Sequence, residues 1–159
     1  MKKEDISDFT MRISQASRSE LVVIMYEVVL CDIRDARESF AAKNWEEYDK
    51  SLLHAGRFVS ELMAALDYNY GISYNLMSLY IFAHRRIVLA KAQKDVDLLD
   101  CAEDIMQKLL TGYRKVSEED TSGPMMTNTQ QVYAGLTYGR GVLNEMYVNA
   151  NEAKRGYTA

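Results

Sequence analysis

Hydrophobic residues recur along most of this chain at the spacing of amphipathic α-helices. Ser17 and Glu20 stand three residues apart, which is the spacing of a capping box and predicts a helix start just before Leu21. Apolar positions continue from there to Phe40, over roughly 20 residues, which is too long for a typical β-strand despite the many Val and Ile residues. A helix is therefore predicted from this start to about Ala42.

The next predicted helix carries the most regular hydrophobic seam of the chain. Asn44 is its expected N-cap, and the two acids at positions 46 and 47 suit the positive end of the helix dipole. Its apolar residues follow a strict 4-3-4-3-4 spacing: Tyr48, Leu52, Ala55, Val59, Leu62 and Leu66. This spacing is typical of the packed seam of a helix bundle.

Two further helices complete the predicted bundle. The sequence DYNYG breaks the second helix, and the third is expected from about Ile72 to Lys94. A fourth helix is expected to begin near Asp95. It repeats the seam at Leu99, Ala102, Met106, Leu109, Tyr113 and Val116. Because short connections force sequence neighbours to lie antiparallel, we predict an all-α fold, an antiparallel up-down four-helix bundle over residues 17–117.

The two ends of the chain have a different texture. Residues 1–16 are polar and are expected to form a flexible leader. Residues 118–159 are predicted to form a polar linker, with the only Pro of the chain, and an extended C-terminal tail. Closely spaced Gly residues weaken helix formation in the tail, yet Val132 to Tyr147 is rich in apolar and aromatic residues, which a disordered segment usually lacks. We interpret the tail as a segment that is docked or able to dock on the bundle and is weakly helical at best.

The third predicted helix has more apolar surface than one bundle core requires. At about 100° per residue from Leu76, a core stripe lies within about 60° of that residue. The stripe comprises Leu79, Tyr80, Ala83, Ile87 and Ala90. A second column lies at about 100–160°. It comprises Tyr74, Met77, Ile81 and Val88, with Arg85 alongside.

The first predicted helix shows a similar excess, in two neighbouring stripes. One stripe comprises Leu21, Met25 and Val28, and the other Val22, Tyr26, Val29 and Ile33. A broad core is one interpretation, because a helix that touches two neighbours has a wide apolar face. The other is a groove that receives amphipathic helices of a partner, bordered by Arg85 and Arg86. The pattern alone leaves both open.

Composition and charge exclude several classes of function. The chain is 48% hydrophobic and 26% charged with a net charge of −4, and its basic residues are dispersed, so neither nucleic acid nor an anionic membrane is an expected partner. Its longest apolar run, LVVIMYEVVLC, is interrupted by Glu27 and falls far short of the roughly 20 residues of a membrane span. Cys31 and Cys101 have neither a CxxC nor a metal-ligand spacing. We expect a soluble, cytoplasmic protein with reduced cysteines and no membrane insertion.

The sequence offers no set of catalytic residues. His54 and His84 lie on different predicted helices, and neither belongs to the Glu-x-x-His pair that di-iron bundles use. No nucleotide-binding Gly-rich loop or G-x-S-x-G motif occurs, and most acids are explained by helix caps and surface ion pairs. We therefore predict no metal, no cofactor and no enzymatic activity.

Three segments in order resemble the flagellin export chaperones, the FliS family. They are QASRSELVVIMYEV at 15–28, ELMAALDYNYG at 61–71 and NLMSLYIFAHRRIVLAKAQKDVDLLD at 75–100, and the resemblance extends over about 13–116. Arg18 and Val28 replace the Pro and Gly that are usual in the first motif, and the turn before the third helix is about two residues shorter. Most members of the family end soon after the fourth helix, so the resemblance says nothing about the tail.

The resemblance implies a chaperone that binds the disordered C-terminal region of flagellin in apolar helix grooves, prevents its premature polymerisation, and contacts an export gate component of the flagellar secretion apparatus. The expected flagellin-binding residues are Leu21, Val22, Met25, Tyr26, Val29, Met77, Tyr80, Ile81, Arg85 and Val88. The family's leader can fold over the groove when the client is absent, with Phe9 and Ile13 as the matching anchors here. The alternative is a structural or regulatory four-helix protein that self-associates through the same column.

Overall fold

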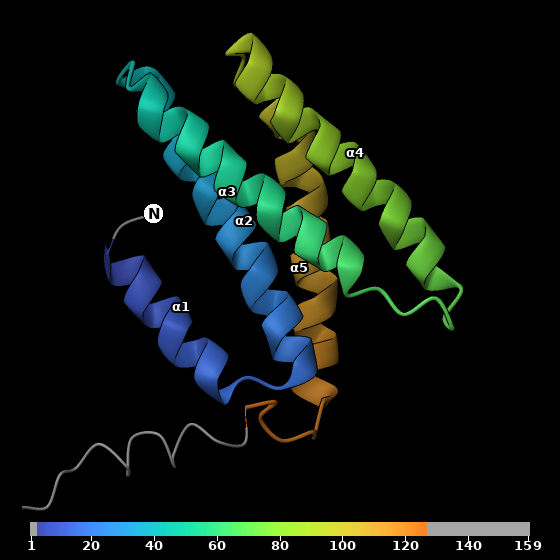
Figure 1. Cartoon of the computed structure of the whole chain (residues 1–159). Coiled ribbons are helices and arrows are strands. Elements are labelled where there is room, and N and C mark those ends of the chain that lie inside the picture. The colour runs from blue at the N-terminus through green and yellow to red at the C-terminus, as the bar shows by residue number, and fades with distance from the viewer. Residues whose placement is uncertain (1–2, 127–159) are drawn as a thin grey trace, which may run out of the picture. The chain divides into compact units, whose positions relative to one another are not determined.

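The computed structural model describes residues 3–126, and every regular element in that range is an α-helix (Figure 1). The helices are α1 (Lys3–Gln15), α2 (Arg18–Ala41), α3 (Trp45–Ala64), α4 (Ile72–Gln93) and α5 (Leu99–Glu119). The all-α prediction is confirmed. The apolar tail segment Val132 to Tyr147 lies outside the described residues.

Helices α2 to α5 form the predicted antiparallel bundle. Each packs against two others, because α2 and α4 both contact α3 and α5. Helix α1 packs mainly against α2. The helices α2 and α4 therefore occupy opposite corners of the bundle, as do α3 and α5 (Figure 1). This arrangement decides which surfaces of the bundle remain open to a partner.

The predicted caps are present at the starts of α2 and α3. The Ser17 hydroxyl accepts a hydrogen bond from the Glu20 N–H at 3.3 Å, and the Glu20 carboxylate accepts one from the Ser17 N–H at 2.7 Å. The Asn44 side chain likewise accepts from the N–H of Glu47 at 3.3 Å. These bonds satisfy backbone donors that have no partner inside the helix, which fixes where each helix begins.

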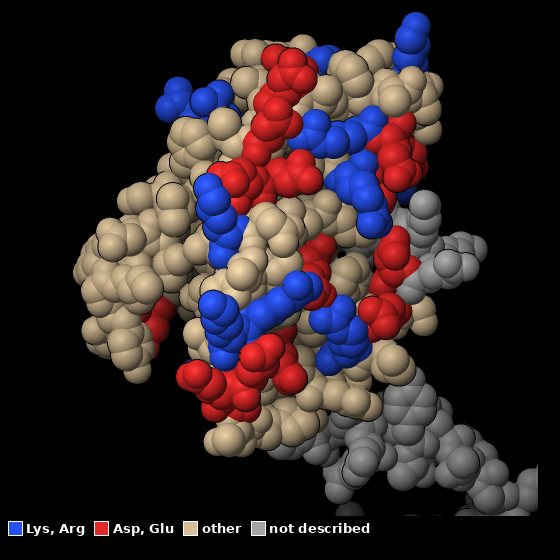
Figure 2. Space-filling view, turned by 180° about the vertical axis from the view of Figure 1, so that it is seen from behind, with Lys and Arg blue, Asp and Glu red and all other residues tan. Residues whose placement is uncertain are grey.

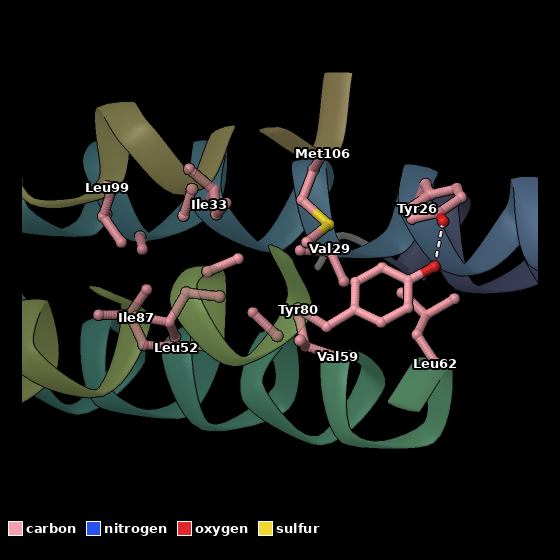
Figure 3. Packing of buried hydrophobic residues seen from close by; sticks show 14 of the residues in the cluster. Tyr26, Val29, Ile33, Leu52, Val59, Leu62, Tyr80, Ile87, Leu99 and Met106 are labelled. Atoms are coloured by element: carbon pink, nitrogen blue, oxygen red, sulfur yellow. Dashed lines mark hydrogen bonds between the residues drawn. The ribbon is translucent and has the colours of Figure 1, made fainter. Parts of the chain in front are cut away.

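The core contains the predicted seam of α3 and most of that of α5 (Figure 3). Its largest fully buried apolar side chains are Tyr26, Tyr48, Tyr80, Ile33, Leu52, Ile87, Leu99 and Met106. In the second half of α5 the predicted seam residues Leu109 and Tyr113 are half-buried against the core, Leu110 is buried beside them, and Val116 is 55% exposed. Seven-residue spacing drifts around a straight helix, so the last predicted seam position, Val116, lies outside the core.

The boundaries of α5 also differ from the prediction. Lys94 adopts a left-handed conformation with φ of 54°, which ends α4. The following residues form the corner, so α5 begins at Leu99 instead of near Asp95. At its other end α5 runs to Glu119, past the predicted end at residue 117. The acidic run that had been interpreted as linker thus forms the last turn of a helix.

The segment expected to be a flexible leader contains helix α1. Helix α1 lays Phe9 and Ile13 against Ile24 and Val28 of α2, with Ala16 closing the corner. Burial of these few apolar side chains offsets the low helix propensity of the segment, because tertiary contact contributes more to a short helix than its own backbone does. The bundle therefore carries a fifth helix on the outer face of α2.

Candidate functional site: an apolar surface on α4

The α4 apolar column, defined as Tyr74, Met77, Ile81 and Val88, faces outward from the bundle. Tyr74, Ile81 and Val88 are 62%, 54% and 50% exposed, and Met77 is half-buried. The adjoining core stripe predicted on α4 is buried at Leu76, Tyr80, Ala83, Ile87 and Ala90. Leu79 is the exception, because it is 39% exposed at the edge of the stripe. The α4 apolar column is thus not part of the core.

A groove of about 400 Å³ runs beside this column between α3 and α4. It is lined by Leu52, Leu53, Gly56, Arg57, Ser60, Glu61, His84, Ile87, Val88 and Lys91. Val88 belongs to both the groove and the α4 apolar column, so the two form one continuous surface. Leu53, which stands outside the predicted seam of α3, is 47% exposed and supplies an apolar wall on that side.

Two arginines border the surface. Arg85 is exposed and forms no ion pair within the described part of the chain, so its guanidinium is available to an acid of a partner. Arg86 lies over the ring of Phe82 at 5.1 Å, on the flank of α4 that turns away from α3. The exposed Phe82 ring is therefore shielded in part by a cation, whereas the α4 apolar column has no such cover among the described residues.

Charge is distributed unevenly over the bundle. Figure 2 shows basic and acidic side chains interleaved over the middle of the rear face, along α5, while the lobe formed by the N-terminal half of α4 carries few of either. Tyr68, Tyr70 and Ile72 precede the column in the sequence and are also exposed, and the Tyr68 ring lies 5.4 Å from that of Tyr74. Contiguous exposed apolar surface of this kind marks sites of interaction.

Three residues predicted to line the groove lie in the core instead. Tyr26, Val29 and Tyr80 are at most 1% exposed. The hydroxyls of Tyr26 and Tyr80 form a hydrogen bond with each other across the bundle, from α2 to α4 (Figure 3). Burial raises the pKa of Tyr80 to about 12 and raises that of Tyr26 further. These side chains are neutral internal cross-links, and no partner on the surface can reach them in this conformation.

The remaining predicted positions on α2 do not join the α4 surface. Leu21 packs with the cluster beneath α1, and Val22 and Met25 are half-buried against the main core. Because α2 and α4 occupy opposite corners, the predicted flagellin-binding residues separate into two surfaces. One is the exposed α4 apolar column, and the other is the strip of α2 that α1 covers.

Helix α1 is attached to that strip by charged groups as well as apolar ones. Arg12 and Arg114 both approach the Glu27 carboxylate, at 2.7 and 2.8 Å, so one acid of α2 joins α1 to α5. The Phe9 and Ile13 side chains supply the apolar part of the contact. The two predicted leader anchors therefore do contact the bundle, on α2.

Comparison with known protein families shows which family this chain belongs to. The family described as "Flagellar protein FliS" matches residues 4–120, a range that runs from α1 to the end of α5. The chain belongs to the FliS family. A comparison with curated proteins found no match. The FliS family consists of non-enzymatic flagellar chaperones, so the predicted resemblance and the prediction of a non-catalytic role are confirmed at the level of the family.

The titratable groups of this FliS-family chain are used in structural contacts. Within residues 3–126, no three His, Cys, Asp or Glu side chains converge as a metal site would require, and both cysteines are free thiols. His54 lies 2.6 Å from the buried carboxylate of Asp32, whose pKa burial raises to about 6 while the histidine opposes the shift. No helix in the described range is long and apolar enough to cross a membrane.

Leu53 is the functional candidate that the sequence analysis missed. It follows Leu52 in the sequence SLLH, and only Leu52 was assigned to a role, as part of the seam of α3. A second apolar residue beside a seam position cannot face the same core, because neighbours in a helix point about 100° apart. The same angular count that separated the two columns of α4 would have identified it.

Proposed function

We propose that this chain is a cytoplasmic export chaperone that binds the disordered C-terminal region of flagellin on the α4 apolar column and the adjoining α3–α4 groove. Membership of the FliS family supports the role of a flagellin export chaperone. The observation that carries the location is the row of outward-facing Tyr74, Ile81 and Val88 on a bundle whose core is already complete. An amphipathic client helix that covers this row is unable to polymerise at the same time.

The geometry suits a client that folds as it binds. Half-exposed side chains such as Ile81 and Val88 each contribute on the order of 1 kcal/mol when a partner covers them. A client that must first become helical loses a part of this free energy, so binding through a few anchors stays reversible. Reversibility is what transfer to an export gate component of the flagellar secretion apparatus requires. Arg85 would orient the client through an acidic side chain.

The strip of α2 beneath α1 is the second client surface in this proposal. In the free chain, Phe9 and Ile13 occupy it and pack against Ile24 and Val28. A client segment that contacts Leu21, which packs with the same cluster, would have to move α1 aside first. Val22 and Met25, which are half-buried against the main core, would extend this surface. Tyr26, Val29 and Tyr80 support both surfaces from inside the core, where they set the spacing of α2 and α4.

Titration with a peptide of the host's flagellin C-terminal region tests the α4 surface. Ile81→Asp places a charge in the middle of the α4 apolar column, and we expect at least a tenfold weaker affinity by calorimetry. Val116→Asp is the matched control, because Val116 is equally exposed, at 55%, but lies on α5. Both variants should unfold at a temperature close to that of the parent chain. Normal affinity of folded Ile81→Asp would exclude the column as the client site.

Self-association through the same column is the alternative function. An exposed apolar column would equally seat the column of a second copy. Light scattering with and without flagellin separates the two. The chaperone should form a complex with flagellin, whereas a stable homodimer that ignores flagellin and dissociates on Ile81→Asp would support the alternative.

A further inference from the structure

We propose that the α3–α4 groove selects client segments in which an apolar residue is flanked by an acidic residue one helical turn away on each side. The occupant is thus a short amphipathic helix that turns two acids and one apolar anchor toward the groove. The inference rests on the proposed function for the presence of a client, and it adds which client sequences bind. Arg57 of α3 and Lys91 of α4 are the residues that contact the two acids.

Two contacts fix the register of α3 against α4. A Cβ atom on Gly56 would lie 3.6 Å from Nε2 of His84, so these two residues stand at about the same level of the bundle. Nearer the end of α4, the Ala90 carbonyl accepts a hydrogen bond from the Tyr48 hydroxyl at 2.8 Å. The two helices are therefore antiparallel and side by side along the groove (Figure 1).

The centre of the groove is apolar. Leu53 on the α3 wall and Val88 on the α4 wall are 47% and 50% exposed, and the buried Leu52 and Ile87 lie between them in the lining. An apolar side chain of a client that covers these residues gains free energy by leaving water. Burial of apolar surface has no direction, so the centre gives affinity without distinguishing one apolar client from another.

Two cations stand on opposite sides of this apolar centre. Arg57 follows Leu53 by four residues in α3, and Lys91 follows Val88 by three residues in α4. Because the helices are antiparallel, these two steps lead in opposite directions along the groove. At 1.5 Å per residue from the level shared by Gly56 and His84, Arg57 and Lys91 lie about 12 Å apart along the helix axes.

This separation defines a spacing in the client. A client helix covers about 12 Å in roughly eight residues, and position i+7 lies on the same face as position i. An apolar anchor at i+3 or i+4 then falls midway, over the centre of the groove. Acids at i and i+7 meet the two cations, whose long side chains can adjust to the small difference in length.

Both cations are available to a client. Arg57 is exposed and Lys91 is half-buried, and neither forms an ion pair within the part of the chain that the structure describes. Most other basic side chains in that part do pair with acids: Arg12, Arg34, Arg37, Lys50, Lys94, Lys108 and Arg114. The charges of the groove are thus not used in holding the bundle together.

The other polar groups of the groove leave its basic character intact. The Ser60 hydroxyl donates to the Gly56 carbonyl at 3.0 Å, so it is used within α3. Glu61 is the only acid among the residues that line the groove, and it follows Arg57 by four residues, on the side away from Lys91. It would repel a client acid placed one turn beyond Arg57, which restricts the acids to the stretch between the two cations.

The net charge of the chain makes this local pair selective. At −4, the chain as a whole repels an acidic segment, so attraction is confined to places where unpaired cations gather. Opposite charges across an interface fix register and exclude wrong partners more than they raise affinity. The apolar centre therefore holds the client, and Arg57 and Lys91 decide which segment of it is held.

Double-mutant cycles with the peptide of the host's flagellin C-terminal region test the inference. Each acid of the peptide is replaced in turn by its amide, and affinities for the parent chain, Arg57→Gln and Lys91→Gln are measured by calorimetry at low ionic strength. We expect each variant to weaken binding about fivefold and to abolish the effect of replacing one particular acid. The acids that couple to Arg57 and to Lys91 should stand seven residues apart in the peptide.

Lys115→Gln is the matched control for loss of charge. Lys115 is exposed on α5 and also forms no ion pair among residues 3–126, so its affinity for every peptide should equal that of the parent. Arg57→Glu provides a rescue. It should bind a peptide whose coupled acid is changed to Lys at least fivefold more tightly than the unchanged peptide, which a purely structural role of Arg57 does not predict. All variants should unfold at a temperature close to that of the parent.

Failure of this inference is distinguishable from failure of the proposed function. A peptide that loses affinity on Ile81→Asp, yet binds Arg57→Gln and Lys91→Gln as it binds the parent, would overturn the inference and leave the α4 apolar column as the client site. An equal loss on Lys115→Gln would also overturn it, because net charge alone would then explain the effect. A homodimer that Arg57→Gln dissociates would assign the groove to a second copy instead. A peptide that does not bind the parent chain would overturn both proposals.

Discussion

The buried pair of tyrosine hydroxyls gives a quantitative prediction about stability. Tyr26 and Tyr80 are 0% and 1% exposed, and each hydroxyl is the partner of the other. Tyr26→Phe or Tyr80→Phe alone removes one hydroxyl and leaves the other buried without that bond, which costs about 1–3 kcal/mol. The Tyr113 ring lies 5.4 Å from that of Tyr26, so its hydroxyl offers partial compensation. We therefore expect about 1–2 kcal/mol for each single variant.

The double variant should cost little more than either single variant. With both hydroxyls gone, no donor or acceptor of the pair remains buried without its partner, so the two effects should be non-additive by about 1–2 kcal/mol. Urea unfolding followed by circular dichroism measures all three free energies, provided that the dependence on urea is unchanged between variants.

Tyr48→Phe provides the control for this cycle. The Tyr48 hydroxyl is also buried, but it donates to the Ala90 carbonyl at 2.8 Å and shares no partner with Tyr26. Its effect should add to that of Tyr26→Phe within roughly 0.5 kcal/mol. Additive effects of Tyr26→Phe and Tyr80→Phe would refute the reasoning, because they would show that the two hydroxyls do not depend on each other.

Three further variants test other contacts. Burial raises the pKa of Asp32 from 3.8 to about 6, so the stability that this carboxyl contributes is full below about pH 4 and is lost as the pH rises through 6. Between pH 4 and 7, the free energy of unfolding of Asp32→Asn should therefore rise by about 3 kcal/mol relative to that of the parent in urea titrations, less any stability lost with the contact to His54. Lys43 has a φ of 55°, so Lys43→Gly should stabilise by up to about 1 kcal/mol in thermal unfolding. Lys94→Gly should gain less or lose, because Lys94 pairs with Asp49.

The helix bundle could be predicted from the sequence because the apolar residues of each helix recur at a spacing that shows which side of the helix packs. The seam from Tyr48 to Leu62 and the angular separation of Ile81 from Ile87 depend only on helical periodicity, and both were predicted correctly. The capping box at Ser17 is equally local. Features of this kind need no knowledge of neighbouring helices.

The parts that the sequence could not predict depend on distant contacts. The burial of Tyr26 is one such feature, because its hydroxyl is satisfied by Tyr80 from the opposite corner of the bundle. Helix α1 forms where its Phe9 and Ile13 meet α2, and a polar segment gives no sign of that contact. Which helices are diagonal follows from tertiary packing, so periodicity alone could not show that the two apolar surfaces are separate.

The placement of α2 and α4 at opposite corners also bears on how tightly a partner can hold. A partner that contacts both the α4 apolar column and the strip beneath α1 must pass around the bundle, so its two segments act as a bivalent ligand. The first contact raises the effective concentration of the second, to an extent set by the length of the intervening chain. Shortening that chain below the span would abolish the gain while leaving each contact intact, so avidity would depend on a part of the partner that touches nothing.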